Sequence, residues 1–232
     1  MPTSFETPPA DPPGAAGPVA ASEKRLAAES AALLVEDGMR VGLGTGTTVA
    51  YLLPALAERE LDVVCVATSV ATETEARLLS LEVRPFDHLA RLDIAIDGAD
   101  QVAQDFWLVK GGGGAHTREK VVAAASDRFV VIVSSDKLVD VIGGPVPLEL
   151  LGFGLAATVR ALSAIGECRL RDAPPTPDGG VLADLYGAIE DVAELARRLG
   201  ATPGVVEHGL FAPGMVHEVL VGRAGAVERL HP

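Results

Sequence analysis

The residues best suited to chemistry are two aspartates, a lysine and a glutamate spaced around a run of glycines. Asp97 and Asp100 end an apolar segment, Lys110 precedes four glycines at 111–114, and Glu119 follows in a segment rich in helix formers. Glycine runs lose much backbone entropy on folding, so they are tolerated mainly where the backbone approaches a ligand. A flexible linker is the alternative, although linkers seldom separate two apolar segments. The combination of acids, a cation and exposed N–H groups indicates an active site.

A second glycine-containing loop, at 42–48, lies between a short apolar strand pattern and a helical pattern. Its backbone N–H groups and the hydroxyls of Thr45, Thr47 and Thr48 can donate to phosphoryl oxygens at the start of a helix. A dinucleotide-binding turn would need Gly at position 47 and an acid after the next strand, where the chain has Thr and the pair 68–69, Thr-Ser. The Gly-Lys-Ser/Thr of a Walker loop is also absent. The loop therefore predicts a phosphate site.

Composition and charge narrow the class of protein. A formal net charge of −13 over 232 residues argues against nucleic acid or an anionic membrane as partner, because both require a basic surface. No apolar run reaches the roughly 18 residues of a membrane helix. An anionic substrate then needs a local cluster of cations, for which Lys110, Arg118, Lys120 and Lys137 are available. Two separated cysteines and five scattered histidines form no zinc pattern, which favours a metal-free protein in a reduced cytoplasmic setting.

The order of elements places these loops at one edge of a sheet. Apolar segments alternate with helical patterns, which predicts an α/β fold: a Rossmann-like, mostly parallel sheet with helices on both faces. Ligands bind outside the carboxyl ends of such strands, where Thr45, Thr68, Asp97 and Lys137 all fall. We expect strands at 40–44, 62–67, 82–84, 92–97, 106–109 and 129–134, and helices at 22–35, 47–60, 71–80 and 115–126.

The chain ends differ from this central part. Residues 1–21 are rich in proline and alanine and carry no lysine or arginine, which predicts a disordered tail before an α/β domain at 22–146. A smaller α+β lobe is expected at 147–222, followed by a C-terminal segment at 223–232. Within that lobe we expect helices at 153–165 and 189–199, strands at 167–171, 181–185, 205–210 and 216–221, and a hairpin turn at 178–180.

The motifs together resemble those of A-type ribose-5-phosphate isomerases. The resemblance implies interconversion of D-ribose 5-phosphate and D-ribulose 5-phosphate without a metal or organic cofactor. It also implies that the smaller lobe is ferredoxin-like and takes part in the contacts of a homodimer or homotetramer, and that the last segment returns to the main domain. The chain departs from the family at Gln101, usually Glu, at His116, commonly apolar, and at Gly180, often Asn. The matching segments are 44–48, 68–69, 97–100, 110–113, 117–120, 135–137 and 145–149.

The resemblance also implies roles for the residues. Glu119 would be the base that carries the proton, with its pKa raised from ~4.3 toward neutrality by burial or neighbouring acids. Lys110 and glycine-loop N–H groups would hold the enediolate charge. Asp97 and Asp100 would serve ring opening and proton traffic between O1 and O2, unless Asp97 only caps a turn. Lys137 would contact substrate or form an exposed salt bridge. The predicted substrate-binding set is Thr45, Gly46, Thr47, Thr48, Asp97, Gly98, Ala99, Asp100, Lys110, Gly111, Gly112, Gly113 and Lys137.

Two other classes of protein could use the same loops. A sugar-phosphate sensor would bind without turnover, but such regulators generally carry a basic DNA-binding module, and the tail here is short and acidic. An acyl-CoA transferase could use a glutamate as nucleophile in a related α/β setting. It would need a pocket for an adenine nucleotide, which no sequence feature marks. Formation of ketose from ribose 5-phosphate alone distinguishes the three classes.

Overall fold

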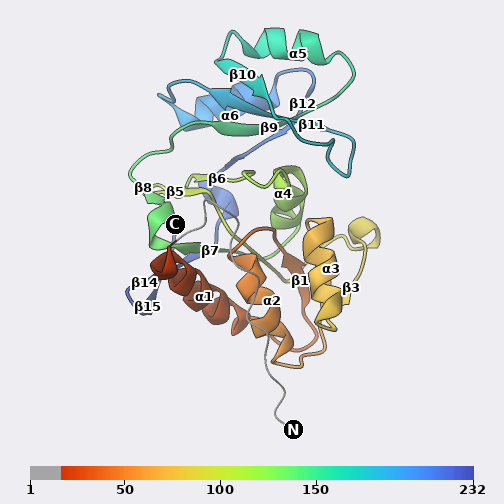
Figure 1. The fold of residues 1–232 in the computed structure, drawn as a ribbon, viewed down its shortest axis with the longest axis vertical. Coiled ribbons are helices and arrows are strands. Elements are labelled where there is room, and N and C mark those ends of the chain that lie inside the picture. Colours follow the sequence, from red (N-terminus) through yellow and green to blue (C-terminus); the bar gives the residue numbers. More distant parts are fainter. Residues whose placement is uncertain (1–16) are drawn as a thin grey trace.

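A seven-stranded sheet forms the larger domain in the computed structural model, which describes residues 17–232 (Figure 1). Its strands lie in the order β15-β14-β7-β4-β1-β2-β3, and neighbouring strands are parallel except for β14 and β15. The mostly parallel sheet predicted from the sequence is confirmed. The strands are β1 (Arg40–Leu43), β2 (Val64–Ala67), β3 (Glu82–Val83), β4 (Ile94–Asp97), β7 (Phe129–Ser134), β14 (Glu218–Arg223) and β15 (Ala226–Leu230).

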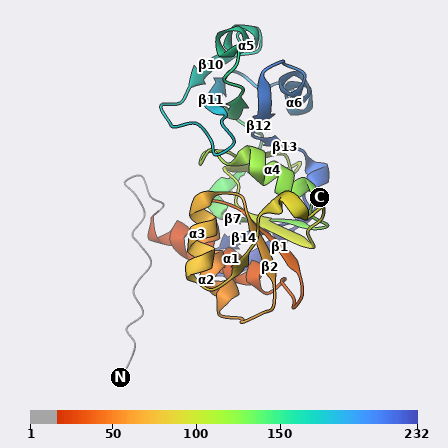
Figure 2. The ribbon, with the colours of Figure 1, turned by 90° about the vertical axis from the view of Figure 1, so that its right-hand side faces the viewer.

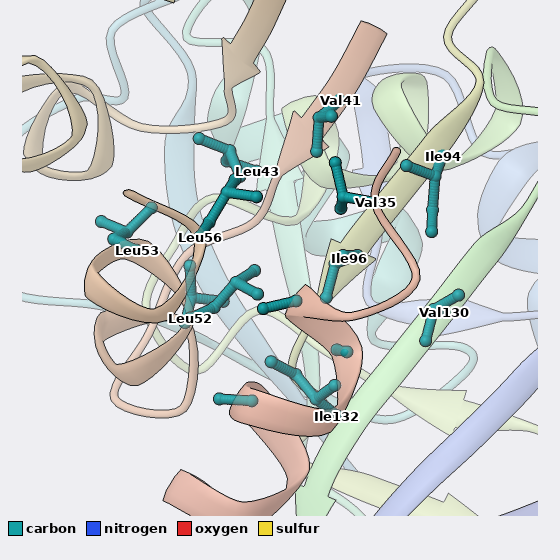
Figure 3. Close-up of a cluster of buried hydrophobic side chains, with 14 of the residues drawn as sticks. Val35, Val41, Leu43, Leu52, Leu53, Leu56, Ile94, Ile96, Val130 and Ile132 are labelled. Atoms are coloured by element: carbon teal, nitrogen blue, oxygen red, sulfur yellow. The ribbon is translucent and has the colours of Figure 1, made fainter. Parts of the chain in front are cut away.

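Helices cover both faces of this sheet. In the inner strand β7, Val130 and Ile132 belong to one buried core, whereas Val131 and Val133 belong to the core on the other face. Figure 3 shows the first core, where three leucines of α2 lie beside side chains of β1 and β4. None of the helices formed by residues 17–232 is long and apolar enough to cross a membrane. The first core is covered by α1 (Pro18–Ala32), α2 (Val49–Ala57) and α3 (Val70–Leu78), and the second by α4 (His116–Ala124).

The first helix differs from the sequence prediction. We expected a helix at 22–35 after a tail at 1–21, but α1 begins at Pro18 and ends at Ala32. Proline is favoured in the first turn because its ring fixes φ near the helical value and its missing N–H has no partner there in any case. The alanines that follow then extend the helix in the N-terminal direction. The remainder of the expected tail, residues 1–16, lies outside the described residues.

A second sheet builds a smaller lobe above α4 and the larger domain (Figure 2). Its order is β10-β11-β9-β12, and all three neighbouring pairs are antiparallel. The chain order strand-helix-strand-strand-helix-strand, with the first and third strands central, is the ferredoxin-like arrangement. The predicted α+β lobe is thus confirmed. Its elements are β9 (Val146–Leu150), α5 (Leu155–Leu162), β10 (Glu167–Leu170), β11 (Val181–Tyr186), α6 (Val192–Gly200) and β12 (Val205–His208).

Two predicted strands have other partners than expected. The strand predicted at 106–109 for the parallel sheet is β6, which instead pairs antiparallel with β5 and β13. The strand predicted at 216–221 for the small lobe is β14, which pairs parallel with β7 in the large sheet. Both errors arise because an apolar run predicts a strand without indicating its neighbours. The third sheet, in the order β13-β6-β5-β8, consists of β5 (Gln101–Ala103), β6 (Leu108–Val109), β8 (Leu138–Val139) and β13 (Leu210–Phe211).

Candidate active site

Four loops from distant parts of the chain meet around one cavity of about 140 Å³. Two follow β1 and β4, one precedes α4, and one follows β7, so the carboxyl ends of parallel strands supply most of the lining. Of the predicted substrate-binding residues only Asp97 is not in the lining, because it lies buried beneath it. The lining residues are Lys24, Thr45, Gly46, Thr47, Thr48, Gly98, Ala99, Asp100, Lys110, Gly111, Gly112, Gly113, Glu119 and Lys137.

A buried cluster of one lysine and two carboxylates lies at the base of the cavity. Lys110 Nζ is 2.9 Å from Asp97 Oδ2 and 3.1 Å from Glu119 Oε2, and it also donates to the carbonyl of Gly98. All three charged side chains are at most 5% exposed. Even when buried charges are paired, the cost of removing them from water offsets most of their attraction, so such a cluster contributes little to stability. Clusters of this kind are typical of active sites. A larger groove of about 1030 Å³ between α1, α2 and α3 contains no comparable buried cluster.

The electrostatics of this cluster suit proton transfer. Burial lowers the pKa of Lys110, but the two carboxylates outweigh burial and raise it above its ordinary value, so the lysine stays charged. Burial raises the pKa of Glu119, the charge of Asp97 raises it further, and Lys110 only partly offsets both. The Lys110–Glu119 contact is an ion pair without hydrogen-bond alignment, so Glu119 Oε2 has no hydrogen-bond donor among residues 17–232. That oxygen can therefore accept a proton.

The glycine loop before α4 has a conformation that other residues cannot adopt. Gly111 has φ +109°, and a Cβ at this position would lie 2.6 Å from His116 Nδ1 and 2.8 Å from Pro147 Cβ. The Gly112 N–H donates to Asp100 Oδ2 at 2.8 Å, which fixes the middle of the loop. As predicted, the loop leads directly into the helix that carries Glu119.

His116, the first residue of that helix, is completely buried beneath the glycine loop. Burial lowers the pKa of His116 to about 4, so the ring is neutral. Neither ring nitrogen has a hydrogen-bond partner within the described part of the chain. The ring therefore fills space beneath the loop as an uncharged side chain.

The loop after β1 is positioned by Asp97. Asp97 Oδ1 accepts from the amides of Thr45, at 3.1 Å, and Gly98, at 2.7 Å. A Cβ at Gly44 would lie 1.9 Å from the Asp97 carboxylate, so glycine is required for this close approach. The Thr45 hydroxyl lies 2.8 Å from that of Thr68. Asp97 thus joins the two strand ends and does more than cap its own turn.

Two further lysines face the cavity. Lys24, on α1, is 7% exposed and donates from Nζ to Thr47 Oγ1 at 2.8 Å. The sequence reasoning missed Lys24, although its spacing from the buried Ala27, Ala28 and Ala31 places it in the apolar stripe of α1. Lys137 lies on a short 3₁₀ turn after β7, 3.6 Å from its neighbour Asp136, and also lines the cavity. The ion pair expected as one alternative for Lys137 is therefore present, and contact with substrate stays a prediction.

Comparison with known proteins places the chain among sugar-phosphate enzymes. The family model for ribose 5-phosphate isomerase A (phosphoriboisomerase A) matches residues 64–225, and one for the DeoR C-terminal sensor domain matches 19–79. The ribose-5-phosphate isomerase A of Rhodopseudomonas palustris strain TIE-1 is 43% identical over 89% of this chain and 96% of that protein. The solved Methanocaldococcus jannaschii ribose 5-phosphate isomerase A is 36% identical over 90% and 98%, with TM-score 0.85. A D-ribose-5-phosphate isomerase solved with phospho-erythronic acid is 33% identical over 90% and 97%, also with TM-score 0.85.

Proposed function

We propose that Glu119 carries the proton in this chain, which belongs to the ribose 5-phosphate isomerase A family and interconverts D-ribose 5-phosphate and D-ribulose 5-phosphate. The observation that supports this role is the buried Glu119 Oε2, which faces the cavity cluster without a hydrogen-bond donor in residues 17–232. A base needs such a free oxygen and a pKa raised toward neutrality, and burial raises the pKa of Glu119.

The reaction can be assigned to these residues step by step. In the open-chain aldose, Glu119 removes the proton from C2, and the C2–H electron pair forms the enediolate double bond while negative charge develops on O1. Glu119 then returns the proton to C1, which leaves the carbonyl at C2. One carboxylate suffices because the two carbons are neighbours. Before that last step the proton on O2 moves to O1, and Asp100, which lines the cavity, can carry it as well as open the ring. Asp97, which was expected to share this role, lies beneath the lining with Oδ1 bonded to two amides and Oδ2 beside Lys110, so it positions the loop and the lysine.

Lys110 supplies the positive charge that the enediolate needs. In the resting site its Nζ lies 2.9 Å from Asp97 Oδ2 and 3.1 Å from Glu119 Oε2 and donates to the Gly98 carbonyl. When Glu119 takes up the substrate proton it loses its charge, so its attraction for Lys110 weakens at the moment when O1 becomes negative. The charge of Lys110 is then available to the oxyanion together with glycine-loop amides. The Gly112 amide is already bonded to Asp100 and contributes by holding the loop.

The other end of the cavity suits the phosphate group. Lys24 and Lys137 bring two cations to the loop of Thr45–Thr48, whose amides lie at the start of α2. The DeoR sensor match, at 19–79, includes Lys24 and the Thr45–Thr48 loop but not Lys137, and it ends before Lys110 and Glu119, so it gives no support for binding without turnover. Cations at one end and proton-transfer groups at the other fit a phosphorylated aldose.

We expect purified protein to form ketose from ribose 5-phosphate with no CoA or other cosubstrate, and to act poorly on ribose. The kcat/KM for ribose should be about 10²–10⁴-fold lower, because two charged hydrogen bonds of about 1.5–3 kcal/mol each are lost. Ketose formation from both sugars is measured in parallel. Comparable kcat/KM values would contradict the phosphate site, and no ketose from either sugar would contradict the isomerase.

We expect kcat/KM for ribose 5-phosphate to rise with pH, with an inflection well above 4.5, the ordinary value for glutamate. The base acts deprotonated, and burial raises the pKa of Glu119, so activity is lost as pH falls through that raised pKa. His116 and His208 do not cause the inflection, since burial lowers the pKa of each to about 4. Initial rates across pH, with circular dichroism as a control for folding, test this. An inflection at or below 4.5 would contradict the assignment.

We further propose a homodimer or homotetramer located in the cytoplasm. The small lobe leaves Phe153 88% exposed and Leu151 and Leu170 each 49% exposed, as expected where another copy packs. A doubly charged sugar phosphate does not cross membranes unaided, which favours an enzyme inside the cell. Light scattering on the purified chain measures the oligomeric state, and a monomer at micromolar concentration would contradict the first proposal.

A further inference from the structure

One arginine of the small lobe reaches the glycine loop of the large domain. Arg171 directly follows β10 and donates from Nη1 to the carbonyl oxygens of Gly111, at 2.8 Å, and Gly112, at 3.2 Å. In Figure 2 the connection between β10 and β11 extends downward from the lobe toward α4, which begins just after this loop. The lobe therefore touches the part of the backbone that lines the cavity.

The guanidinium of Arg171 is itself held in place. Its Nε donates to Asp184 Oδ2 at 2.9 Å and its Nη2 to Asp184 Oδ1 at 2.6 Å, a two-pronged pair from the neighbouring strand β11. Both side chains are only 18% exposed. A planar guanidinium with both edges engaged has little freedom, so Nη1 is aimed at the two carbonyls.

Four consecutive glycines need such support. Each Gly peptide can rotate readily because no side chain restricts it. A rotated Gly111 or Gly112 peptide would turn its carbonyl oxygen toward the enediolate and repel it. Asp100 holds the loop by one amide, and Arg171 holds it by two carbonyls. Because Arg171 holds the Gly111 and Gly112 carbonyl oxygens, these oxygens cannot turn toward the substrate, and the N–H ends of the loop peptides can stabilise a negative charge there.

We propose that Arg171 is a positioning residue of the isomerase: with Asp184 it fixes the Gly111 and Gly112 peptides so that the glycine loop favours the enediolate. The inference rests on the proposed function of that loop. Arg171 is not in the cavity lining, so it acts through the glycines and not on the substrate. The small lobe then contributes to catalysis and not only to contacts between subunits.

A neighbouring pair on β10, the strand that Arg171 directly follows, offers a matched control. Arg169 forms a similar two-pronged pair with Glu167, with both distances 2.8 Å, but its side chain is 57% exposed and touches no loop of the cavity. Exposed pairs of this kind contribute little to stability. Arg171→Gln and Arg169→Gln therefore remove the same chemical group at positions two residues apart, and only the first should affect turnover.

The test measures kcat, KM, melting temperature and the inhibition constant of phospho-erythronic acid. The carboxylate of that acid places negative charge where the enediolate carries it. Arg171→Gln should lower kcat by about 10–100-fold, the usual result of a small misplacement in an active site. Affinity for the acid should fall by a similar factor, with KM changed much less. Arg169→Gln should match the wild type, and Arg171→Lys, which keeps the charge without the fork, should lie between.

The outcomes separate the two proposals. Wild-type kcat in Arg171→Gln would overturn the positioning role, and so would a fall in kcat with undiminished affinity for the acid. If the Gln variant does not fold, the same two measurements on Arg171→Lys decide the matter. A wild-type protein that forms no ketose in this assay would overturn the isomerase itself, whatever Arg171 does.

Discussion

Glu119→Gln is expected to lower turnover by about 10²–10⁴-fold, while affinity for ribose 5-phosphate changes much less. Glutamine keeps the size of the side chain and can still accept a hydrogen bond, but it cannot take up the C2 proton. The substituted oxygen is the one that lies 3.1 Å from Lys110 at the base of the cavity. Without a base there the enediolate does not form at a useful rate.

Two readouts distinguish loss of the base from general damage. Ketose formation reports the complete reaction, and loss of deuterium from C2-labelled ribose 5-phosphate to water reports proton removal alone. Glu75→Gln on the exposed face of α3 is the control, and it should keep full activity and lose no more than about 0.5 kcal/mol of stability. If Glu119→Gln still isomerises and exchanges at near wild-type rates, Glu119 is not the base, and Asp100, the other carboxylate of the cavity lining, must take that role.

The sequence was sufficient to predict the centre of this site. Asp97 and Lys110 lie on different loops, but the rule that parallel strands end at the same edge brings the loops together. The glycine run and the helix formers after it predicted a loop leading into a helix, and α4 begins at His116 as expected within one residue. These features are local, or follow from a general property of α/β sheets.

Features that depend on distant packing could not be predicted in this way. Lys24 contacts Thr47 only because α1 packs beside the phosphate loop, and a single lysine in a helix does not indicate that neighbour. Arg171 reaches Gly111 only because of how the small lobe sits on the large domain. The strand β14 was assigned to the wrong lobe for the same reason, since its apolar pattern fits either sheet.

Lys110→Met is expected to reduce turnover strongly and to reduce stability more than any other substitution considered. The lysine is the cation between Asp97 and Glu119, and methionine has similar bulk but no charge. Loss of one oxyanion donor costs about 10²–10³-fold in kcat. Removal of one partner from a buried charge cluster costs about 3–5 kcal/mol of unfolding free energy, because the remaining carboxylates are left uncompensated.

The loss of stability in Lys110→Met should depend on pH in a defined direction. Burial already raises the pKa of Asp97 and Glu119 in the folded protein, and without Lys110 only the Thr45 and Gly98 amides, both at Asp97, still oppose that rise. Carboxyls with raised folded pKa values contribute stability that is complete below the unfolded value near 4 and is lost as pH rises through the folded value. The unfolding free energy of the variant should therefore be closest to that of wild type near pH 4.5 and far below it at pH 8. Urea unfolding at both pH values measures this, with Lys137→Met, from an exposed ion pair, as the control for stability. An equal deficit at both pH values would show that Lys110 does not compensate the two acids.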